Sequence, residues 1–218
     1  MTYDLRPDEI RVLGVLIEKS LALPAYYPMT TNAITAACNQ KNNREPVTQY
    51  TESEVSAAIS SLRRRQLVDQ APPERNSRAI RFQHLVEQRY QWNAATRAIM
   101  CELMIRGPQT SGELKAHAGR MTHLESTEYA REILSELERC DPPMVVEMPL
   151  EAGKRERRFA QLLGGPPAPV PNSAVAVPIG MSTARSASGA VDSARLEEME
   201  ARLSKVEQQL AELMKCVM

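Results

Sequence analysis

An internal repeat constrains this chain more than any other feature of its sequence. In the first half, apolar residues follow the helical spacing i, i+3, i+4 and i+7 at Val55, Ala58, Ile59 and Leu62. The same pattern recurs in the second half at Ala130, Ile133, Leu134 and Leu137, and Arg81-Phe82 recurs as Arg158-Phe159. Such a repeat predicts one supersecondary unit built twice.

Each repeat is predicted to contain three helices followed by a hairpin. In the first, the apolar residues of 7–20 mark one helical face, Thr30 and Thr31 can cap a second helix, and residues 51–54 form a capping box for a third. Leu67-Val68 and Ile80 to Phe82 are the expected strands, on either side of a polar turn. Three helices and a hairpin are the elements of a winged helix, a variant of the helix-turn-helix.

The predicted fold class is therefore mainly α with small β-wings (α+β), with two tandem winged-helix domains and a C-terminal coiled-coil helix. We place winged-helix domain 1 at residues 1–90 and winged-helix domain 2 at residues 91–163. Residues 164–192 are rich in Pro, Ala, Ser and Gly, which predicts a disordered linker. Residues 193–218 are the predicted coiled-coil tail.

The tail carries apolar residues spaced alternately by three and four, as in a coiled-coil seam. We expect dimerisation through the residues at these positions, which are Leu196, Met199, Leu203, Val206, Leu210 and Leu213. Three heptads are short for an isolated helix, so the alternative of a frayed, loosely helical terminus stays open.

The composition argues against several classes of protein. Acidic and basic residues both number 27, so any nucleic-acid binding must rest on local basic patches. The four cysteines lie far apart with no histidine at ligand spacing, which argues against a zinc site. No apolar stretch reaches the roughly 20 residues that span a bilayer, and the N-terminus lacks a signal-peptide pattern. We expect a cytoplasmic protein with no membrane association.

Several residues are candidates for contact with double-stranded DNA, because a helix-turn-helix places its third helix in the major groove and wings commonly touch phosphate. On the third helix of the first repeat these are Ser53, Ser56, Ser60, Arg63 and Arg64. In the wings they are Arg75, Arg78, Lys154, Arg155 and Arg157. Alternatively, the arginines are solvated surface, or complement a helix dipole at Arg63 to Arg65. The equivalent helix of the second repeat presents Glu128, Glu132 and Glu136, which phosphate would repel.

The polar loop from Asn39 to Val47 joins the second and third helices of the first repeat. Its amide and basic side chains could contact bases or phosphate. They could equally cap helix ends and satisfy the loop backbone, which we favour. Its length also displaces the third helix from the usual docking geometry.

No catalytic constellation is visible in the sequence: we find no nucleophile with a base, no paired carboxylates and no phosphate loop. We therefore expect no enzyme activity, no cofactor and no metal. His84, His117 and His123 are interpreted as structural or surface residues. Cys38 aligns with Ala118 in the repeat and is interpreted as a small core residue.

The segment from Tyr26 to Val47, with Ala37-Cys38-Asn39-Gln40-Lys41-Asn42-Asn43-Arg44 at its centre, closely resembles the YceH-like family of bacterial proteins. The resemblance continues through residues 106–114, Arg120-Met121 and residues 153–157, and covers about Leu5 to Leu163. It implies a tandem winged-helix fold and leaves activity, ligand and catalytic residues open.

Two functions compete at this stage. One is a winged-helix, DNA-binding protein resembling a transcription regulator, which acts as a dimer through its tail. The other is a non-enzymatic protein-interaction scaffold built from tandem winged helices, which the neutral net charge and the acidic third helix of the second repeat favour.

Overall fold

The computed structural model describes residues 4–73 and 79–166. The N-terminal half contains α1 (Pro7–Ala22), η1 (Pro24–Tyr26), α2 (Thr31–Cys38), α3 (Glu52–Arg64), β1 (Val68–Gln70) and β2 (Phe82–His84). After α4 (Val86–Tyr90), the C-terminal half contains α5 (Ala94–Arg106), α6 (Ser111–Ala118), α7 (Thr127–Arg139), β3 (Val145–Glu147) and β4 (Phe159–Gln161). The described part is mainly helical with two small antiparallel sheets, which confirms the predicted α+β class.

Polar side chains fix where the helices begin. The Thr30, Thr51, Thr110 and Ser126 hydroxyls accept hydrogen bonds from backbone N–H groups in the first turns of α2, α3, α6 and α7. At α3 and α6 the capping box is complete, because Glu54 and Glu113 accept from the backbone N–H of Thr51 and Thr110. The capping signals used in the sequence prediction are therefore present as bonds.

The repeat extends to contacts that the sequence pattern did not predict. Met29, between α1 and α2, forms a bridge with Phe82 of the hairpin, and Gln109 forms the same bridge with Phe159. Arg81 donates to the Pro28 carbonyl at 3.1 Å, and Arg158 donates to the Pro108 carbonyl at 2.7 Å. In each half, the segment before the second helix thus joins the hairpin as a minimal third strand.

The hairpin strands lie slightly later in the chain than predicted. β1 pairs with β2 so that Val68 faces His84 and Gln70 faces Phe82, and Ile80 lies outside the strand with its side chain exposed. Backbone bonds extend the pairing at both ends, since Ala71 N–H donates to the Arg81 carbonyl beside the turn and Leu85 N–H donates to the Leu67 carbonyl at the open end. The short helix α4, which the sequence analysis did not predict, follows directly.

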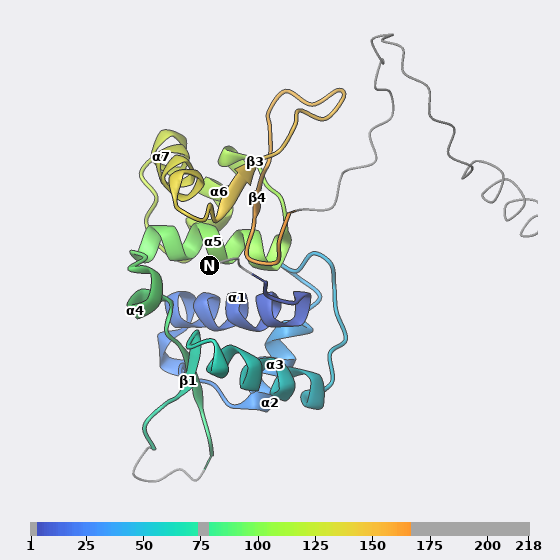
Figure 1. Ribbon diagram of the computed structural model, residues 1–218, viewed down its shortest axis with the longest axis vertical. Helices are drawn as coiled ribbons and strands as arrows, with labels where there is room; N and C mark the ends of the chain where they lie inside the picture. The colour runs from blue at the N-terminus through green and yellow to red at the C-terminus, as the bar shows by residue number, and fades with distance from the viewer. Residues whose placement is uncertain (1–3, 74–78, 167–218) are drawn as a thin grey trace, which may run out of the picture. The chain divides into compact units, whose positions relative to one another are not determined.

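The two halves pack against each other through α1 and α5, which run side by side in Figure 1. Each residue from Glu9 to Ile17 in α1 is buried, and so is each residue from Ala95 to Ile105 in α5 except the half-buried Arg97. Helices that are buried on all sides belong to the interior of a domain rather than to its surface. The apolar core is accordingly one cluster that includes residues of both halves.

Helices α2 and α3 pack on one side of the α1–α5 pair, and α6 and α7 pack on the other (Figure 1). The described residues all fall within one compact unit, so the predicted division at residue 90 stays a prediction. Gly164, the first residue of the predicted linker, lies against α1, since a Cβ built there would be 2.8 Å from Ile10 Cδ1, and Gly165 N–H donates to the Leu162 carbonyl. The rest of that linker and the whole predicted tail, with Leu196, Met199, Leu203, Val206, Leu210 and Leu213, lie outside the described residues.

None of the described helices is long and apolar enough to cross a membrane.

Candidate functional site

The exposed face of α3 is the part of the predicted DNA-binding site that the structure describes best. Its apolar residues Val55, Ala58, Ile59 and Leu62 are buried, and α3 packs on α1. The opposite face leaves the predicted contact residues exposed: Ser53, Ser56, Ser60, Arg63 and Arg64. The first two turns of this face carry the short hydroxyl side chains of Ser53 and Ser56, with the exposed carboxylate of Glu52 at the start of the helix.

Two of the three arginines at the end of α3 are bound by their own chain. Arg63 forms an ion pair with Asp69 of β1 at 3.4 Å, and Arg65 donates to the Asp4 carbonyl at 2.8 Å. Both arginines remain exposed at the surface, where an ion pair contributes little free energy. Arg63 can therefore exchange Asp69 for a phosphate at small cost.

The basic residues predicted to contact DNA in the two hairpins are described only in part. Arg75 and Arg78 lie outside the described residues. In the second wing, Lys154 and Arg155 are exposed, whereas Arg157 forms an ion pair with Glu147 at 2.8 Å. The basic character of the second hairpin is thus reduced by two neighbouring carboxylates, since Arg158 also forms an ion pair with Glu113.

Helix α7 presents the acidic stripe that its sequence predicts. Glu128, Glu132 and Glu136 are all exposed, while Ala130, Ile133, Leu134 and Leu137 are buried. Hydrogen bonds from the helix N-terminus and from Ser126 lower the pKa of Glu128, which keeps this carboxylate charged. Because α3 and α7 lie on opposite sides of the α1–α5 pair, the structure does not bring the two third helices together (Figure 1).

The loop between α2 and α3 uses its polar groups for contacts within the protein. Asn39 donates to the Tyr50 carbonyl and accepts from Tyr50 N–H, both at 2.8 Å. The buried Arg44 forms an ion pair with Glu18 of α1 at 2.6 Å and donates to the Ala37 carbonyl at 3.1 Å. These bonds support the capping interpretation of the loop over direct contact with bases.

The same loop also reaches across to the C-terminal half. Glu45 N–H donates to the Ile105 carbonyl at 2.9 Å, and Arg106 donates to the Asn43 side chain at 2.5 Å. The segment that leads into α3 is therefore attached to the end of α5. This connection was not predicted, because nothing local in the loop indicates a partner about 60 residues away.

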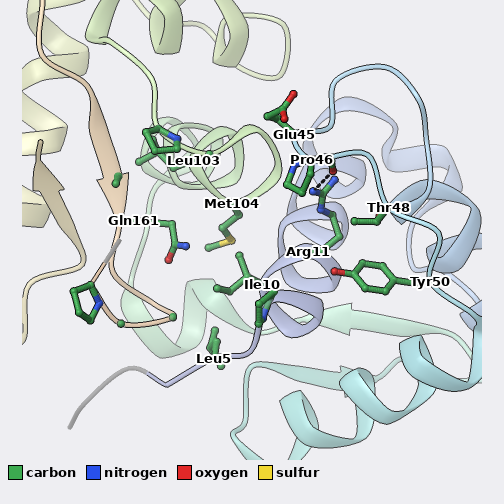
Figure 2. A pocket seen from close by; sticks show the side chains of 17 residues that line it. Leu5, Ile10, Arg11, Glu45, Pro46, Thr48, Tyr50, Leu103, Met104 and Gln161 are labelled. Atoms are coloured by element: carbon green, nitrogen blue, oxygen red, sulfur yellow. Dashed lines mark hydrogen bonds between the residues drawn. The ribbon is translucent and has the colours of Figure 1, made fainter. Parts of the chain in front are cut away.

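A cavity of about 310 Å³ lies between the two halves, beside this loop. Figure 2 shows Arg11 and Tyr50 on one side of it, Met104 and Gln161 on the other, and Leu5 and Ile10 between them. Arg11 is only 3% exposed and donates to the Pro46 carbonyl at 2.7 Å. Burial, with Arg44 nearby, lowers the pKa of Arg11.

Arg11 is the functional candidate that the sequence analysis overlooked. A signal for it existed, because the apolar residues around it, Ile10, Val12 and Val15, point to different sides of one helix. A helix that is apolar on all sides is buried, and an arginine within it is then buried too.

The remaining titratable candidates are held in structural contacts. His84 Nε2 lies 2.9 Å from the Ser20 hydroxyl, and burial lowers its pKa to about 4. Cys38 is fully buried, and burial raises the pKa of its thiol to about 12, as suits a core residue. Within residues 4–73 and 79–166, no three metal-binding side chains come together.

Comparison with known proteins gives a consistent result. Residues 5–154 match a family described as "Protein of unknown function, DUF480". A UPF0502 protein of Geobacter sulfurreducens is 45% identical over 159 residues, which cover 73% of this chain and 72% of the relative. A UPF0502 protein of Azoarcus sp. is 38% identical over 212 residues, 97% of this chain and 90% of the relative. One from Koribacter versatilis is 41% identical over 163 residues, 75% of each chain.

Proposed function

The chain belongs to the DUF480 family, which includes UPF0502 proteins, and from this premise and the geometry of α3 we propose that it is a double-stranded DNA-binding protein of the winged-helix type. It acts in the cytoplasm as a regulator of transcription rather than as an enzyme. Its two halves contribute unequally.

The exposed face of α3 carries this proposal. A recognition helix enters the major groove with the residues of its N-terminal half. Ser53, Ser56 and Ser60 are small and exposed along the outward side of α3, which carries one early carboxylate, Glu52. Arg63 and Arg64 follow one turn later, where they can contact the phosphates that flank the groove.

Helix α7 is proposed to have a different role, since its carboxylates would face phosphate in the same docking geometry. The contribution of the C-terminal half to DNA binding then comes from its wing, where Lys154 and Arg155 are exposed. Self-association through residues 193–218 would add affinity by linking two copies, without fixing the distance between their binding sites.

The proposal is tested by matched substitutions at equivalent positions of α3 and α7. Ser60 directly follows the buried Ile59 in α3, and Ser135 directly follows the equivalent Leu134 in α7. Ser60→Glu and Ser135→Glu therefore make the same change in the two helices. Retention of full-length protein on mixed duplex DNA is measured as salt is raised. We expect Ser60→Glu to weaken binding about tenfold or more, because its carboxylate would face phosphate, and Ser135→Glu to leave it unchanged.

Two results would contradict the proposal. One is the absence of DNA binding at the lowest salt, where counterion release favours it most. The other is equal binding by the two variants. A chain truncated after Pro166 tests the role of the tail separately. If the tail acts through avidity, truncation lowers the affinity for DNA but keeps its dependence on salt.

The exposed acidic face of α7 favours a second candidate function, a protein-interaction scaffold. The face lies on the side of the α1–α5 pair away from α3, so a partner could occupy it without touching DNA (Figure 1). The test is affinity capture with wild-type protein and with a Glu128→Gln, Glu132→Gln, Glu136→Gln triple variant, after nuclease treatment. A partner that is captured equally by both proteins would count against a role for this face.

A further inference from the structure

The cavity between the halves has the size and the wall of a small-molecule site. Its volume of about 310 Å³ is at the lower end of the range for ligand pockets, which is about 300 to 1,000 Å³. Much of the wall is apolar, with Leu5, Ile10, Leu103, Met104 and Ala160 among its residues. Such a wall favours a ligand with a hydrocarbon body over a purely polar one.

Arg11 is an anomaly in this wall. It is 3% exposed, and its side chain makes one hydrogen bond to the described residues, from Nη2 to Pro46. Its Nη1 is buried without a hydrogen-bond partner there, and no described carboxylate lies within ion-pair distance. Arg44, the other buried arginine nearby, has Glu18 as its partner.

A buried cation without a counter-ion is costly, and natural structures satisfy nearly all buried polar groups. The guanidinium is planar and presents parallel N–H groups that match the two oxygens of a carboxylate. Glu45 also lines the cavity, and its charge repels every anion, most strongly those with several negative charges. If the guanidinium of Arg11 binds an anion here, an anion with a single charge is therefore favoured over one with several.

We propose that this cavity binds a small organic monocarboxylate. The apolar body of the ligand packs against Ile10, Leu103 and Met104, and its carboxylate accepts hydrogen bonds from Arg11. The site is distinct from the exposed face of α3, and the proposal does not depend on DNA binding.

The test compares acids with their neutral amides, which have nearly the same shape and no charge. Phenylacetate, 4-phenylbutyrate and hexanoate, and the three corresponding amides, are titrated into full-length protein by calorimetry without DNA. We expect saturable binding of at least one acid with one site per chain, and binding of its amide weaker by about tenfold or more. If no acid binds at millimolar concentration, or if the amide binds equally well, the proposal is overturned and a water molecule is the better partner for Arg11.

Two further measurements locate the site. Arg11→Met should remove the preference for the acid over the amide, whereas Arg139→Met, at an exposed arginine of α7, should retain it. Should Arg11→Met fail to fold, methyl spectra of 13C-methionine-labelled wild-type protein serve instead, with Met104 assigned by Met104→Leu. The acid should shift the Met104 methyl resonance and leave that of Met148, which does not line the cavity, unchanged. The opposite pattern would place the ligand elsewhere and overturn the proposal.

Discussion

At the scale of single residues, His84 shows how a titratable side chain can hold a hairpin against the helices that precede it. Its ring lies against Tyr27, with centroids 5.7 Å apart, and its backbone N–H donates to the Tyr27 hydroxyl at 2.7 Å. The Ser20 hydroxyl donates to the Ile17 carbonyl, so it is free to accept from His84 Nε2. These contacts suit a neutral imidazole, and protonation would place a charge in a buried position.

The free energy of unfolding should therefore decrease as the pH falls through the titration range of His84. The pKa of His84 is lowered from 6.5 to about 4, mainly by burial and also by the charge of Arg97. Between these values the unfolded chain binds a proton that the folded chain does not, so acid favours unfolding. The free energy of unfolding is unaffected by His84 above pH 6.5 and decreases as the pH falls from 6.5 to 4. The total decrease amounts to about 3 kcal/mol.

Urea unfolding at several pH values measures this effect, and the repeat supplies the control. Gln161 occupies the equivalent position of the second hairpin, so His84→Gln replaces the imidazole by the residue that the other half uses. The variant should lose the part of the pH dependence that lies between pH 6.5 and pH 4. Identical pH dependence in both proteins would show that other groups dominate acid unfolding.

At the scale of elements, Asn39 closes the loop that leads into α3. Its amide bonds to both backbone groups of Tyr50, which immediately precedes the N-cap Thr51. We expect Asn39→Ala to lower the free energy of unfolding by about 1–3 kcal/mol, because it leaves two backbone groups without their partners. The amide of Tyr50 should also exchange with solvent faster, as measured by hydrogen exchange on peptides that cover residues 48–54.

Asn42→Ala is the matched control, since Asn42 lies exposed in the same loop. It should leave both stability and exchange unchanged. Equal effects of the two substitutions would mean that the loop tolerates the loss of the Asn39 bonds.

Interactions between residues that are close in the sequence were predicted, and interactions between residues far apart in the sequence were not. Thr51 and Glu54 announce the start of α3 because their bonds join residues three apart, and the buried face of α3 follows from helical spacing. The bond from Glu45 to Ile105 and the bridge from Met29 to Phe82 join distant residues, and no local pattern encodes them. The loop was accordingly predicted to be polar and capping, but its attachment to α5 was not predicted.

The candidate sites divide in the same way. Serines on the outer face of α3 were predicted correctly to be exposed, because exposure follows from the burial of the opposite face. The cavity required the arrangement of both halves, since Ile10, Met104 and Gln161 come from α1, α5 and β4. Periodicity assigns an inward face to each helix, but it does not say which helices meet there.

At the scale of the whole molecule, the burial of the central turns of α1 and α5 against both halves implies that neither half can unfold alone. Unfolding of the C-terminal half would expose the face of α1 that packs on α5, including the residues around Gly14. Within the described residues this pairing has more contacts than any other between two elements. An interface of this kind stabilises the two halves as one cooperative unit, unlike the loosely docked domains of many multidomain chains.

We therefore expect one unfolding transition, with Gly14→Ala lowering the stability of both halves together. An added Cβ at Gly14 would lie 2.8 Å from Ile105 Cγ2 and 2.9 Å from Met104 Cβ, so the helices must move apart at a cost of about 1–3 kcal/mol. Gly112→Ala in α6 is the control, because its Cβ would meet no atom nearer than 3.9 Å, and stability should stay equal or rise slightly.

Trp92 fluorescence and far-ultraviolet circular dichroism, followed during urea unfolding, should give coincident curves for wild type and both variants. Hydrogen exchange in α3 and α6 should accelerate together in Gly14→Ala. Separate transitions, or a change confined to one of these helices, would show that the halves are independent domains and that the α1–α5 contact contributes little to their stability.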